Sequence, residues 1–283
     1  MYNEAMTGNV MQNKATLGFF TNPKSDSAVK GLRAALDHAL SLGYQCCLDP
    51  AITALRDYKL PSSYERRPDY IIAFGGDGTI LHAAEIASEI DAPILGVNLG
   101  RVGFLSEITE DGFDEALSRL DAKDYALDSR MMLECRVDEG KRRVCLNEAL
   151  LYKRSFSGVV DISMEIDGIS AGSVLCDGLI ISTSTGATGY SISAGGPVIA
   201  PGLDVMIITP VCPHTLYVRP IIASKDSRLS FSMNSEGYIS LDGIYTSKIN
   251  KDDRIDIGRA RTHVDFIRFN RQNLYSLIRD KLS

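Results

Sequence analysis

The hydrophobic positions in the first 125 residues alternate between short apolar runs and stretches with helical spacing. Residues 17–22 (LGFFTN) and 70–74 (YIIAF) are continuous apolar runs, as found in buried strands. Between them, residues 27–43 place apolar side chains three and four positions apart and end at Gly43, which predicts a helix with a glycine cap. Residues 44–49 and 92–99 predict further strands, and residues 80–90 and 111–122 predict further helices. This alternation predicts a mostly parallel, Rossmann-like α/β sheet covered by helices.

After about residue 125 the pattern changes to short β-rich segments separated by turn signals. RRVCLNEALLY at 142–152 and SVLCDGLIIST at 173–183 are examples, and IDG at 166–168 and LDG at 241–243 are typical of hairpin turns. This half predicts a β-sandwich. We therefore expect an α/β domain over residues 1–125 and a β-rich domain over residues 126–269. A final helix over 270–283 is expected to pack back on the first domain.

Composition excludes several classes of protein. The chain has 283 residues, of which 45% are hydrophobic and 23% charged, which excludes a disordered chain. It has no apolar stretch of ~20 residues for a membrane span and no basic N-terminal segment followed by an apolar run for a signal peptide. The net charge of -6, without a Lys/Arg cluster, argues against nucleic-acid binding.

Cysteine and histidine usage indicates the compartment and argues against a metal centre. The six cysteines form no CxxC pair and lie mostly in apolar runs, which favours a reducing cytoplasm over a disulfide framework. The four histidines are scattered, so a metal site made by protein ligands alone is not expected.

The densest chemical signal is Gly75-Gly76-Asp77-Gly78-Thr79, which follows a predicted strand and precedes a predicted helix. The glycines allow a sharp turn and close approach of a ligand, and the N–H groups of a helix N-terminus favour phosphate. A carboxylate beside phosphate is repelled unless it binds a cation or accepts a hydroxyl proton, so Asp77 indicates phosphoryl transfer onto an alcohol. The segment matches neither the P-loop nor the G-x-G-x-x-G pattern. The alternative is a structural turn in which Asp77 caps the helix.

A second glycine-rich segment spans residues 176–203, where an apolar strand runs into STSTGATGY at 182–190. Small hydroxyl side chains and exposed amides can hold phosphate or ribose oxygens, and the ring of Tyr190 can stack on a base. Composition alone favours equally a Ser/Thr/Gly loop in which Tyr190 only packs against the protein.

Together these segments resemble the NAD kinase family. GGDGT at 75–79 matches its first motif, and VNLGRVGFLSEI at 97–108 resembles its G-x-N-x-G-x-x-G-F-L segment. Asn147-Glu148 resembles the N-E pair of the family, and DGLIISTSTGATGYSISAGGP at 177–197 resembles its second glycine-rich motif. PHTL at 213–216 and RP at 219–220 continue the match. The matches follow in order from about residue 17 to about residue 270, which a chance motif would not do.

The resemblance implies transfer of a phosphoryl group from ATP, or from another donor such as polyphosphate, to the 2′-hydroxyl of the adenosine ribose of NAD, which makes NADP. It implies that Asp77 is the general base and that Mg²⁺ accompanies the phosphate donor. It also implies a homodimer or homotetramer in the cytoplasm, with no nucleic-acid or membrane partner. The residues it places around the substrates are Gly76, Gly78, Thr79, Phe104, Leu105, Asn147, Glu148, Asp177, Thr185, Thr188, Gly189, Tyr190, Ser193 and, less directly, Asp242.

Several of these residues also have ordinary structural interpretations. Asn147 and Glu148 alone are typical of a strand edge that faces solvent, Asp177 of a turn, and Asp242 of a hairpin turn. Arg130, which follows Asp128 by two positions, is typical of a structural ion pair.

The chain departs from the family pattern at Ser184 and within Ala187-Thr188-Gly189-Tyr190, where the family commonly has Ser-Thr-Ala-Tyr, and two other functions stay open. Ser184 stands where the family commonly has proline, which predicts a slightly looser loop, and Gly189 lacks a methyl group that would touch the ligand. GGDGT also occurs in lipid kinases, so a lipid or small-alcohol kinase is one alternative, although no membrane-binding amphipathic segment is evident. A non-catalytic NAD(P)-binding sensor is the other, and the retained Asp77 argues against it.

Overall fold

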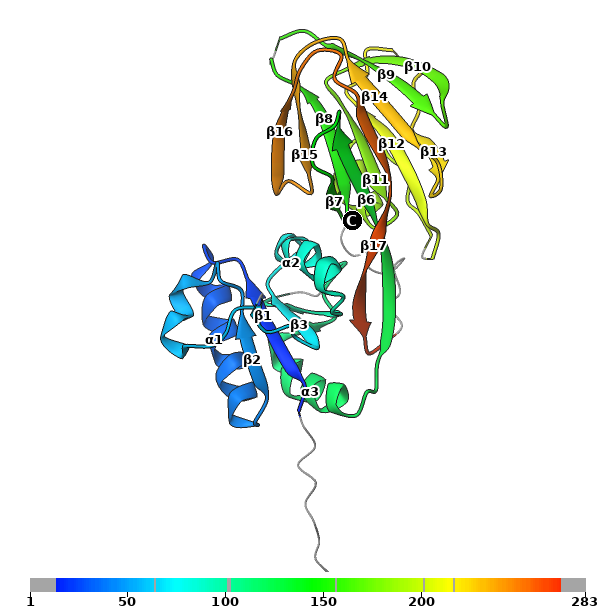
Figure 1. Cartoon of the computed structure of the whole chain (residues 1–283). Helices are drawn as coiled ribbons and strands as arrows, with labels where there is room; N and C mark the ends of the chain where they lie inside the picture. The colour runs from blue at the N-terminus through cyan, green and yellow to red at the C-terminus, as the bar shows by residue number, and fades with distance from the viewer. Residues whose placement is uncertain are drawn as a thin grey trace, which may run out of the picture.

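A helix-covered parallel sheet and a β-sandwich lie end to end in this protein (Figure 1). The computed structural model describes residues 14–63, 65–100, 103–155, 157–200, 202–215 and 217–270. The predicted fold class, an α/β domain followed by a β-rich sandwich, is confirmed. The predicted helix over 270–283 lies almost wholly outside the described residues.

The chain passes through its elements in the following order. The strands are β1 Thr16–Thr21, β2 Gln45–Leu48, β3 Tyr70–Phe74, β4 Ile94–Asn98, β5 Ile108–Thr109, β6 Ala126–Val137, β7 Arg143–Cys145, β8 Glu148–Lys153, β9 Val160–Ile166, β10 Ile169–Cys176, β11 Gly178–Thr183, β12 Val205–Val211, β13 Ile221–Ser224, β14 Leu229–Met233, β15 Gly237–Leu241, β16 Tyr245–Ile249 and β17 Ile255–Arg268. The helices are α1 Asp26–Ser41, α2 Asp77–Ile90, α3 Phe113–Asp121 and α4 Tyr190–Ser193, with 3₁₀ turns at Thr53–Tyr58, Glu110–Gly112 and Gly186–Thr188.

In the first domain the parallel strands lie in the order β2-β1-β3-β4. Strand β3 is buried on both faces, which explains its uninterrupted apolar sequence. Its alternate side chains separate two core clusters: Ile72 and Phe74 pack with α1 and α3, while Ile71 and Ala73 pack with α2. Gly43 follows α1 with φ of 84°, so the predicted glycine cap is confirmed.

The second domain packs two sheets face to face. One is a six-stranded antiparallel sheet in the order β13-β12-β11-β8-β15-β16. The other contains β10, β9, β14, β17, β6 and β7, and it is continuous with the parallel sheet of the first domain. One apolar cluster, which includes Leu133, Leu151, Ile181 and Phe231, fills the space between them.

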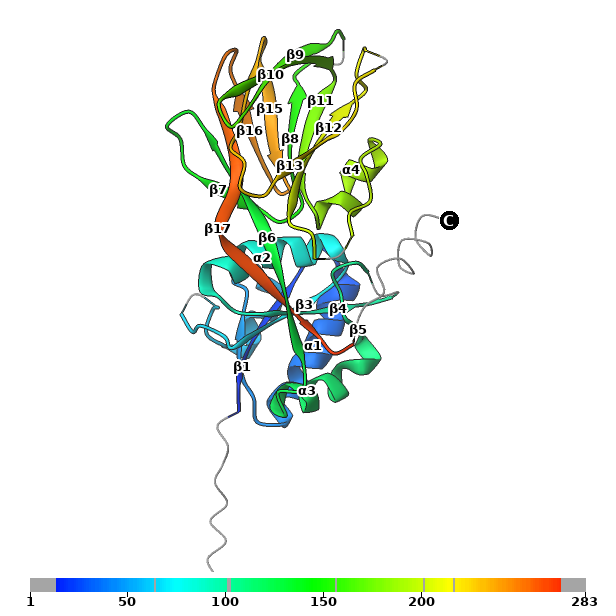
Figure 2. The same ribbon diagram turned by 90° about the vertical axis from the view of Figure 1, so that its right-hand side faces the viewer.

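Two long antiparallel strands, β6 and β17, run from the sandwich into the α/β domain (Figures 1 and 2). At one end β17 pairs with β14 of the sandwich, and at the other end Phe266 pairs with Ile94 of β4 in parallel. In the sequence, DRIDIG at 253–258 and HVDFIRF at 263–269 have the pattern of two separate β segments, but in the structure they belong to one strand that joins the domains. The sequence pattern did not predict this continuity.

Two segments that were expected as single strands are each divided. RRVCLNEALLY gives β7 and β8 with a break at Leu146 and Asn147, and SVLCDGLIIST gives β10 and β11 with a break at Asp177. The chain changes sheets at both breaks, since β7 and β10 belong to one sheet and β8 and β11 to the other. The first break leaves Asn147 outside the strands, while Glu148 begins β8 and pairs with Ser182 of β11.

Within the described residues, no helix is long and apolar enough to cross a membrane.

Candidate active site

The Asp77 carboxylate is held by the backbone of a neighbouring loop. Its two oxygens accept hydrogen bonds from the N–H groups of Phe104 (3.1 Å) and Leu105 (3.2 Å). Helix α2 begins at Asp77, three residues earlier than predicted, and its N-cap is Gly76. The interpretation of Asp77 as a helix cap is therefore wrong, because its side chain binds the 103–107 loop and not the first turn of its own helix.

The glycines of the GGDGT segment have different roles. Gly75 has φ of 147°, and a Cβ there would lie 2.4 Å from Oγ1 of Thr79, so this glycine is required by the protein itself. Gly76 and Gly78 are exposed, and a Cβ on either would meet no described atom within 4 Å. Open backbone at a helix N-terminus beside Asp77 leaves space for phosphate groups.

The loop that holds Asp77 is itself tightly built. The Gly103 N–H donates to Oγ of Ser106 (2.5 Å), and a Cβ on Gly103 would lie 2.2 Å from Oδ1 of Asp77. The Leu105 side chain is buried in the cluster that contains Ile80 of α2 and Leu146, so it belongs to the core. Leu105 therefore contributes its backbone N–H to the site, and not its side chain. The side chain of Phe104 is half-buried.

Residues 146–148, called the N-E segment below, lie on the sandwich side of the apolar cluster that contains Leu105 and Leu146. The Asp242 carboxylate accepts three backbone N–H groups, from Leu146 (2.7 Å), Asn147 (2.8 Å) and Glu148 (2.9 Å). Asp242 does lie in a hairpin turn, between β15 and β16, with φ of 51°. Its side chain also shapes the N-E segment, which the turn interpretation did not include.

Two buried acceptor atoms in the N-E segment have no hydrogen-bond partner in the described structure. They are Oδ1 of Asn147 and Oε2 of Glu148. Burial, and then the charge of the nearby Asp242, raise the pKa of Glu148 to about 7. Burial also raises the pKa of Asp242, although its three N–H bonds favour the charged form. Glu148 therefore holds a proton below about pH 7. Buried polar atoms without partners need an explanation, and a bound ligand is one.

The second glycine-rich segment docks directly onto the N-E segment. The Thr183 hydroxyl donates to the carbonyl of Leu146 (2.6 Å), and the Thr183 N–H donates to the carbonyl of Asn147 (2.9 Å). A Cβ on Gly186 would lie 2.1 Å from the same Asn147 carbonyl, so close backbone approach requires glycine there. A Cβ on Gly189 would lie 3.3 Å from Oε2 of Glu148, which places the missing methyl group beside that unpartnered acceptor.

The remaining predicted residues of this segment surround the same turn. Thr185 is buried, and the Thr188 hydroxyl donates to its carbonyl (3.2 Å). Tyr190, on α4, has 45% of its surface exposed, and Ser193 is also exposed. The Ser184 hydroxyl donates to the carbonyl of Leu203 and accepts from the N–H of Val205. Proline at position 184 would make neither bond. Serine in place of the family proline was expected to loosen this loop, but its two hydrogen bonds fix the loop to the 203–205 segment.

Asp177 lies far from Asn147 and Glu148 in the structure. It precedes β11, whereas Glu148 pairs with Ser182 near the other end of that strand, five residues or about 17 Å away. Asp177 forms an ion pair with Lys153 (2.5 Å). Within one chain it is therefore not brought together with Asn147 and Glu148.

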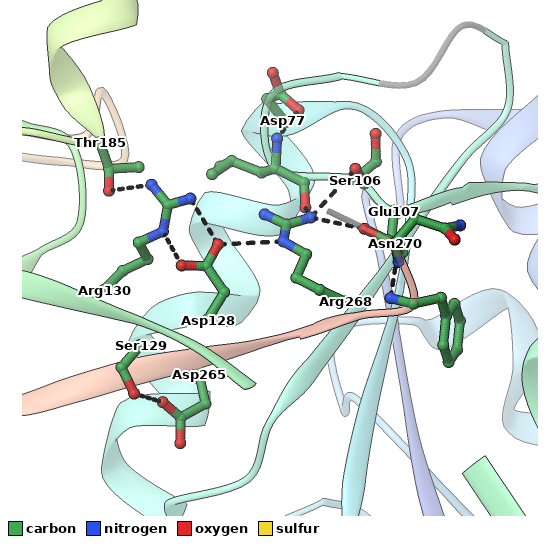
Figure 3. A network of polar contacts seen from close by, with 12 residues as sticks. Asp77, Ser106, Glu107, Asp128, Ser129, Arg130, Thr185, Asp265, Arg268 and Asn270 are labelled. Carbon is green, nitrogen blue, oxygen red and sulfur yellow. Dashed lines mark hydrogen bonds and ion pairs between the residues drawn. The ribbon is translucent and has the colours of Figure 1, made fainter. Parts of the chain in front are cut away.

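An ion-pair network joins the two sides of the site (Figure 3). Arg130 of β6 forms a bidentate pair with Asp128 (2.6 and 2.8 Å), which confirms the predicted ion pair, and its Nη1 lies 3.4 Å from Oγ1 of Thr185. Asp128 also accepts from Nε of Arg268 (3.2 Å), at the end of β17. Arg268 and Gly103 were not singled out from the sequence. Gly103 lay within a quoted motif, whereas Arg268 is 140 positions from Asp128 and carries no local signal.

No group of three or more His, Cys, Asp or Glu side chains that could hold a metal ion occurs in the described parts of the chain.

Comparisons with known proteins identify the family. Residues 57–125 match the ATP-NAD kinase N-terminal domain, and residues 146–269 match the ATP-NAD kinase C-terminal domain. The NAD kinase of Geotalea daltonii is 36% identical over 260 residues, which cover 89% of this chain and 88% of the relative. The NAD kinase of Caldanaerobacter subterraneus subsp. tengcongensis is 34% identical over 278 residues, which cover 94% and 98%.

Solved structures agree with this assignment. An NAD kinase from Archaeoglobus fulgidus in complex with ATP has a TM-score of 0.73 and 26% identity, and covers 94% of this chain and 98% of its own. Yeast NADH kinase complexed with NADH has a TM-score of 0.84, covers 96% and 88%, and at 20% identity supports the fold alone. The motifs at the domain junction, both domain matches and these relatives together select one of the interpretations that the sequence left open: the chain belongs to the NAD kinase family of enzymes.

Proposed function

We propose that this enzyme transfers the terminal phosphoryl group of ATP to the 2′-hydroxyl of the adenosine ribose of NAD and so produces NADP. The observation that carries the proposal is the Asp77 carboxylate, fixed by two backbone N–H groups beside an open helix N-terminus. Phosphoryl transfer depends mainly on positioning and electrostatics, and this arrangement supplies both.

Asp77 acts as the general base. Each of its oxygens accepts one backbone N–H, and a carboxylate offers about four acceptor positions, so acceptor capacity remains for the ribose hydroxyl. The hydroxyl proton moves to Asp77 as the ribose oxygen attacks the terminal phosphorus and the bond to the leaving diphosphate breaks. The two N–H groups hold the carboxylate in one orientation during this step.

The N-E segment binds the acceptor substrate. Oδ1 of Asn147 and Oε2 of Glu148 are buried without a described partner, and hydroxyl groups of NAD would satisfy them. Thr185, Thr188 and the exposed Tyr190 lie on the adjoining turn, where hydroxyl groups and an aromatic face suit the rest of the dinucleotide.

The residues present fit Mg²⁺ that arrives with the phosphate donor. Asp77 is a carboxylate at an open helix N-terminus, and Mg²⁺ is usually bound by one or two carboxylates together with substrate phosphates and water. When bound, the ion would neutralise charge on the phosphates. The backbone at Gly76 and Gly78 is open to the same phosphate groups.

We further propose a homodimer or homotetramer in the cytoplasm. Strand β13 ends its sheet in the described structure, and Ile221 and Ile222 are exposed on it, 36% and 54%. An apolar edge of this kind favours subunit pairing. All six cysteines are unpaired, which suits a reducing compartment. A sedimentation mass equal to one chain would contradict the oligomer.

The experiment is an assay of purified enzyme with NAD, ATP and Mg²⁺, in which NADP is measured by an NADP-specific dehydrogenase. Asp77→Asn should lower kcat by ~10²–10⁴-fold with folding unchanged. Asp91→Asn is the matched control, because Asp91 lies at the other end of α2 with its side chain 80% exposed. No NADP from the wild-type enzyme with ATP or polyphosphate, or full activity of Asp77→Asn, would overturn the proposal. Parallel reactions with diacylglycerol and sphingosine test the lipid kinase alternative.

A further inference from the structure

We propose that Arg268 is a positioning residue for phosphoryl transfer: it holds the loop that orients Asp77 and, through Asp128 and Arg130, couples that loop to Thr185 on the dinucleotide side. The inference rests on the proposed function. It assigns a role in the reaction to a buried ion-pair network that spans the domain junction (Figure 3).

The Leu105 peptide groups form the link between Arg268 and Asp77. The Leu105 N–H donates to Oδ1 of Asp77 (3.2 Å), and the Leu105 carbonyl accepts from Nη1 of Arg268 (3.3 Å). The same Nη1 lies 3.4 Å from the carbonyl of Ser106. Arg268 therefore binds the carbonyl groups of Leu105 and Ser106, directly after the Leu105 N–H that donates to Asp77.

The same nitrogen of the guanidinium also binds a buried carboxylate. Nη1 pairs with Glu107 (3.3 Å), whose other oxygen accepts the N–H groups of Phe269 (2.9 Å) and Asn270 (3.2 Å). The Arg268 and Glu107 side chains are 8% and 3% exposed. A charged pair buried to this extent has little freedom, because moving either member leaves a charge without its partner. The position of the 103–107 loop is thus tied to the end of β17.

The other end of the network reaches the dinucleotide side. Asp128 accepts Nε of Arg268 (3.2 Å) and both a terminal nitrogen and Nε of Arg130, and Arg130 reaches Oγ1 of Thr185 (3.4 Å). Burial opposes ionisation of Asp128, but the two arginines outweigh it and lower its pKa, so the carboxylate stays charged. Phe266 lies directly opposite Asp128 in the β6–β17 register, which places Arg268 diagonally across the strands. Both strands run between the domains, so the network is anchored on the elements that join them.

The test separates a positioning role from a structural one by a double-mutant comparison. Arg268→Lys keeps the positive charge but cannot hold the loop carbonyls and Asp128 together, because an ammonium lacks the planar fork. We expect kcat to fall at least ~10-fold while KM for NAD changes less than ~2-fold. When Asp77→Asn is already present, Arg268→Lys should change the residual turnover by less than ~2-fold, because no base remains to be oriented. This residual turnover is measured by mass spectrometry of NADP. Arg130→Met, at the other end, should instead raise KM for NAD.

Arg119→Lys is the matched control. Arg119 donates to the carbonyl of Phe269 (3.0 Å), next to Arg268, and pairs with Asp124 (2.8 Å), but makes no contact with the 103–107 loop in the described structure. It should leave kcat and KM unchanged. If Arg268→Lys does not fold, Asp128→Asn carries the test, since Asp128 is 31% exposed and its loss weakens the same grip.

The outcomes separate the two proposals. Wild-type enzyme that makes no NADP removes the proposed function itself. If the wild type makes NADP, the positioning role is overturned by unchanged kcat, by an effect on KM alone, or by equal losses with and without the Asp77→Asn substitution. A loss of kcat confined to the enzyme with intact Asp77 supports it.

Discussion

Replacing Gly103 by alanine should disable the enzyme without replacing any side chain that contacts substrate. A Cβ built on Gly103 lies 2.2 Å from Oδ1, 2.9 Å from Cγ and 3.0 Å from Oδ2 of Asp77. Since carbon and oxygen that are not bonded stay at least ~3.2 Å apart, the carboxylate must move by ~1 Å or the loop must retreat by the same amount. Either movement breaks the two N–H bonds that orient the base.

The expected loss follows from that displacement. A misplacement of ~1 Å at a reacting group can cost ~10²-fold in rate, which corresponds to roughly 2.7 kcal/mol of barrier. We therefore expect kcat of Gly103→Ala to fall ~10²-fold, no further than Asp77→Asn, with KM for NAD nearly unchanged. NADP formation under saturating NAD and ATP measures kcat, and thermal unfolding confirms that the variant is folded.

Gly100 provides the control for this prediction. It precedes the same loop, and among the described atoms a Cβ there would meet nothing closer than Oδ1 of Asn98 at 4.0 Å. Gly100→Ala should keep kcat within ~2-fold. Full activity of Gly103→Ala would refute the reasoning, since it would show that Asp77 does not need the orientation given by the 103–107 loop.

Three further predictions concern the sandwich side of the site. Asp242→Asn leaves at least one of three N–H groups without an acceptor, so it should lower the free energy of unfolding by roughly 1–3 kcal/mol and raise KM for NAD. The control is Asp167→Asn in the other Asp-Gly hairpin, which should leave KM unchanged because the Asp167 carboxylate binds exposed groups. Glu148 has a pKa of about 7 in the folded protein and an ordinary pKa of 4.5, so its contribution to the free energy of unfolding should be complete below about pH 4.5 and be lost, by up to roughly 3 kcal/mol, as pH rises through about 7. Denaturant titrations across this range should show that the difference in free energy of unfolding between the wild type and Glu148→Gln falls as pH rises, and a difference that does not depend on pH would contradict the assignment. Ser184→Ala removes both bonds to the 203–205 segment and should lower the thermal midpoint by an amount equivalent to about 1–2 kcal/mol, whereas an unchanged midpoint would show that the serine does not tie down the loop.

The parts of the fold that the sequence predicted are those set by local pattern. Strand β3 matches its apolar run, Tyr70–Phe74, residue for residue, and α1 ends where Gly43 allows a left-handed turn. Errors arose where a polar residue interrupts an apolar run without a turn signal. Asn147 and Asp177 each lie where the chain changes sheets, and no local propensity distinguishes such a change from a polar residue on a strand.

The candidate site divides in the same way between local and long-range information. Asp77, Asn147 and Thr185 were found because short motifs keep chemistry and backbone geometry together in a few consecutive residues. Their support is long-range: Asp242 lies 94 to 96 positions from the N–H groups it accepts, and Arg268 lies 163 positions from Leu105. Nothing in the sequence near Arg268 distinguishes it from an arginine on an exposed strand. It gains its role only because β17 returns through the sandwich to pair with β4, which brings the end of the last described strand beneath the loop that holds the base. The motif therefore specifies the carboxylate that we propose as the base, while the topology supplies the contacts that hold it in place.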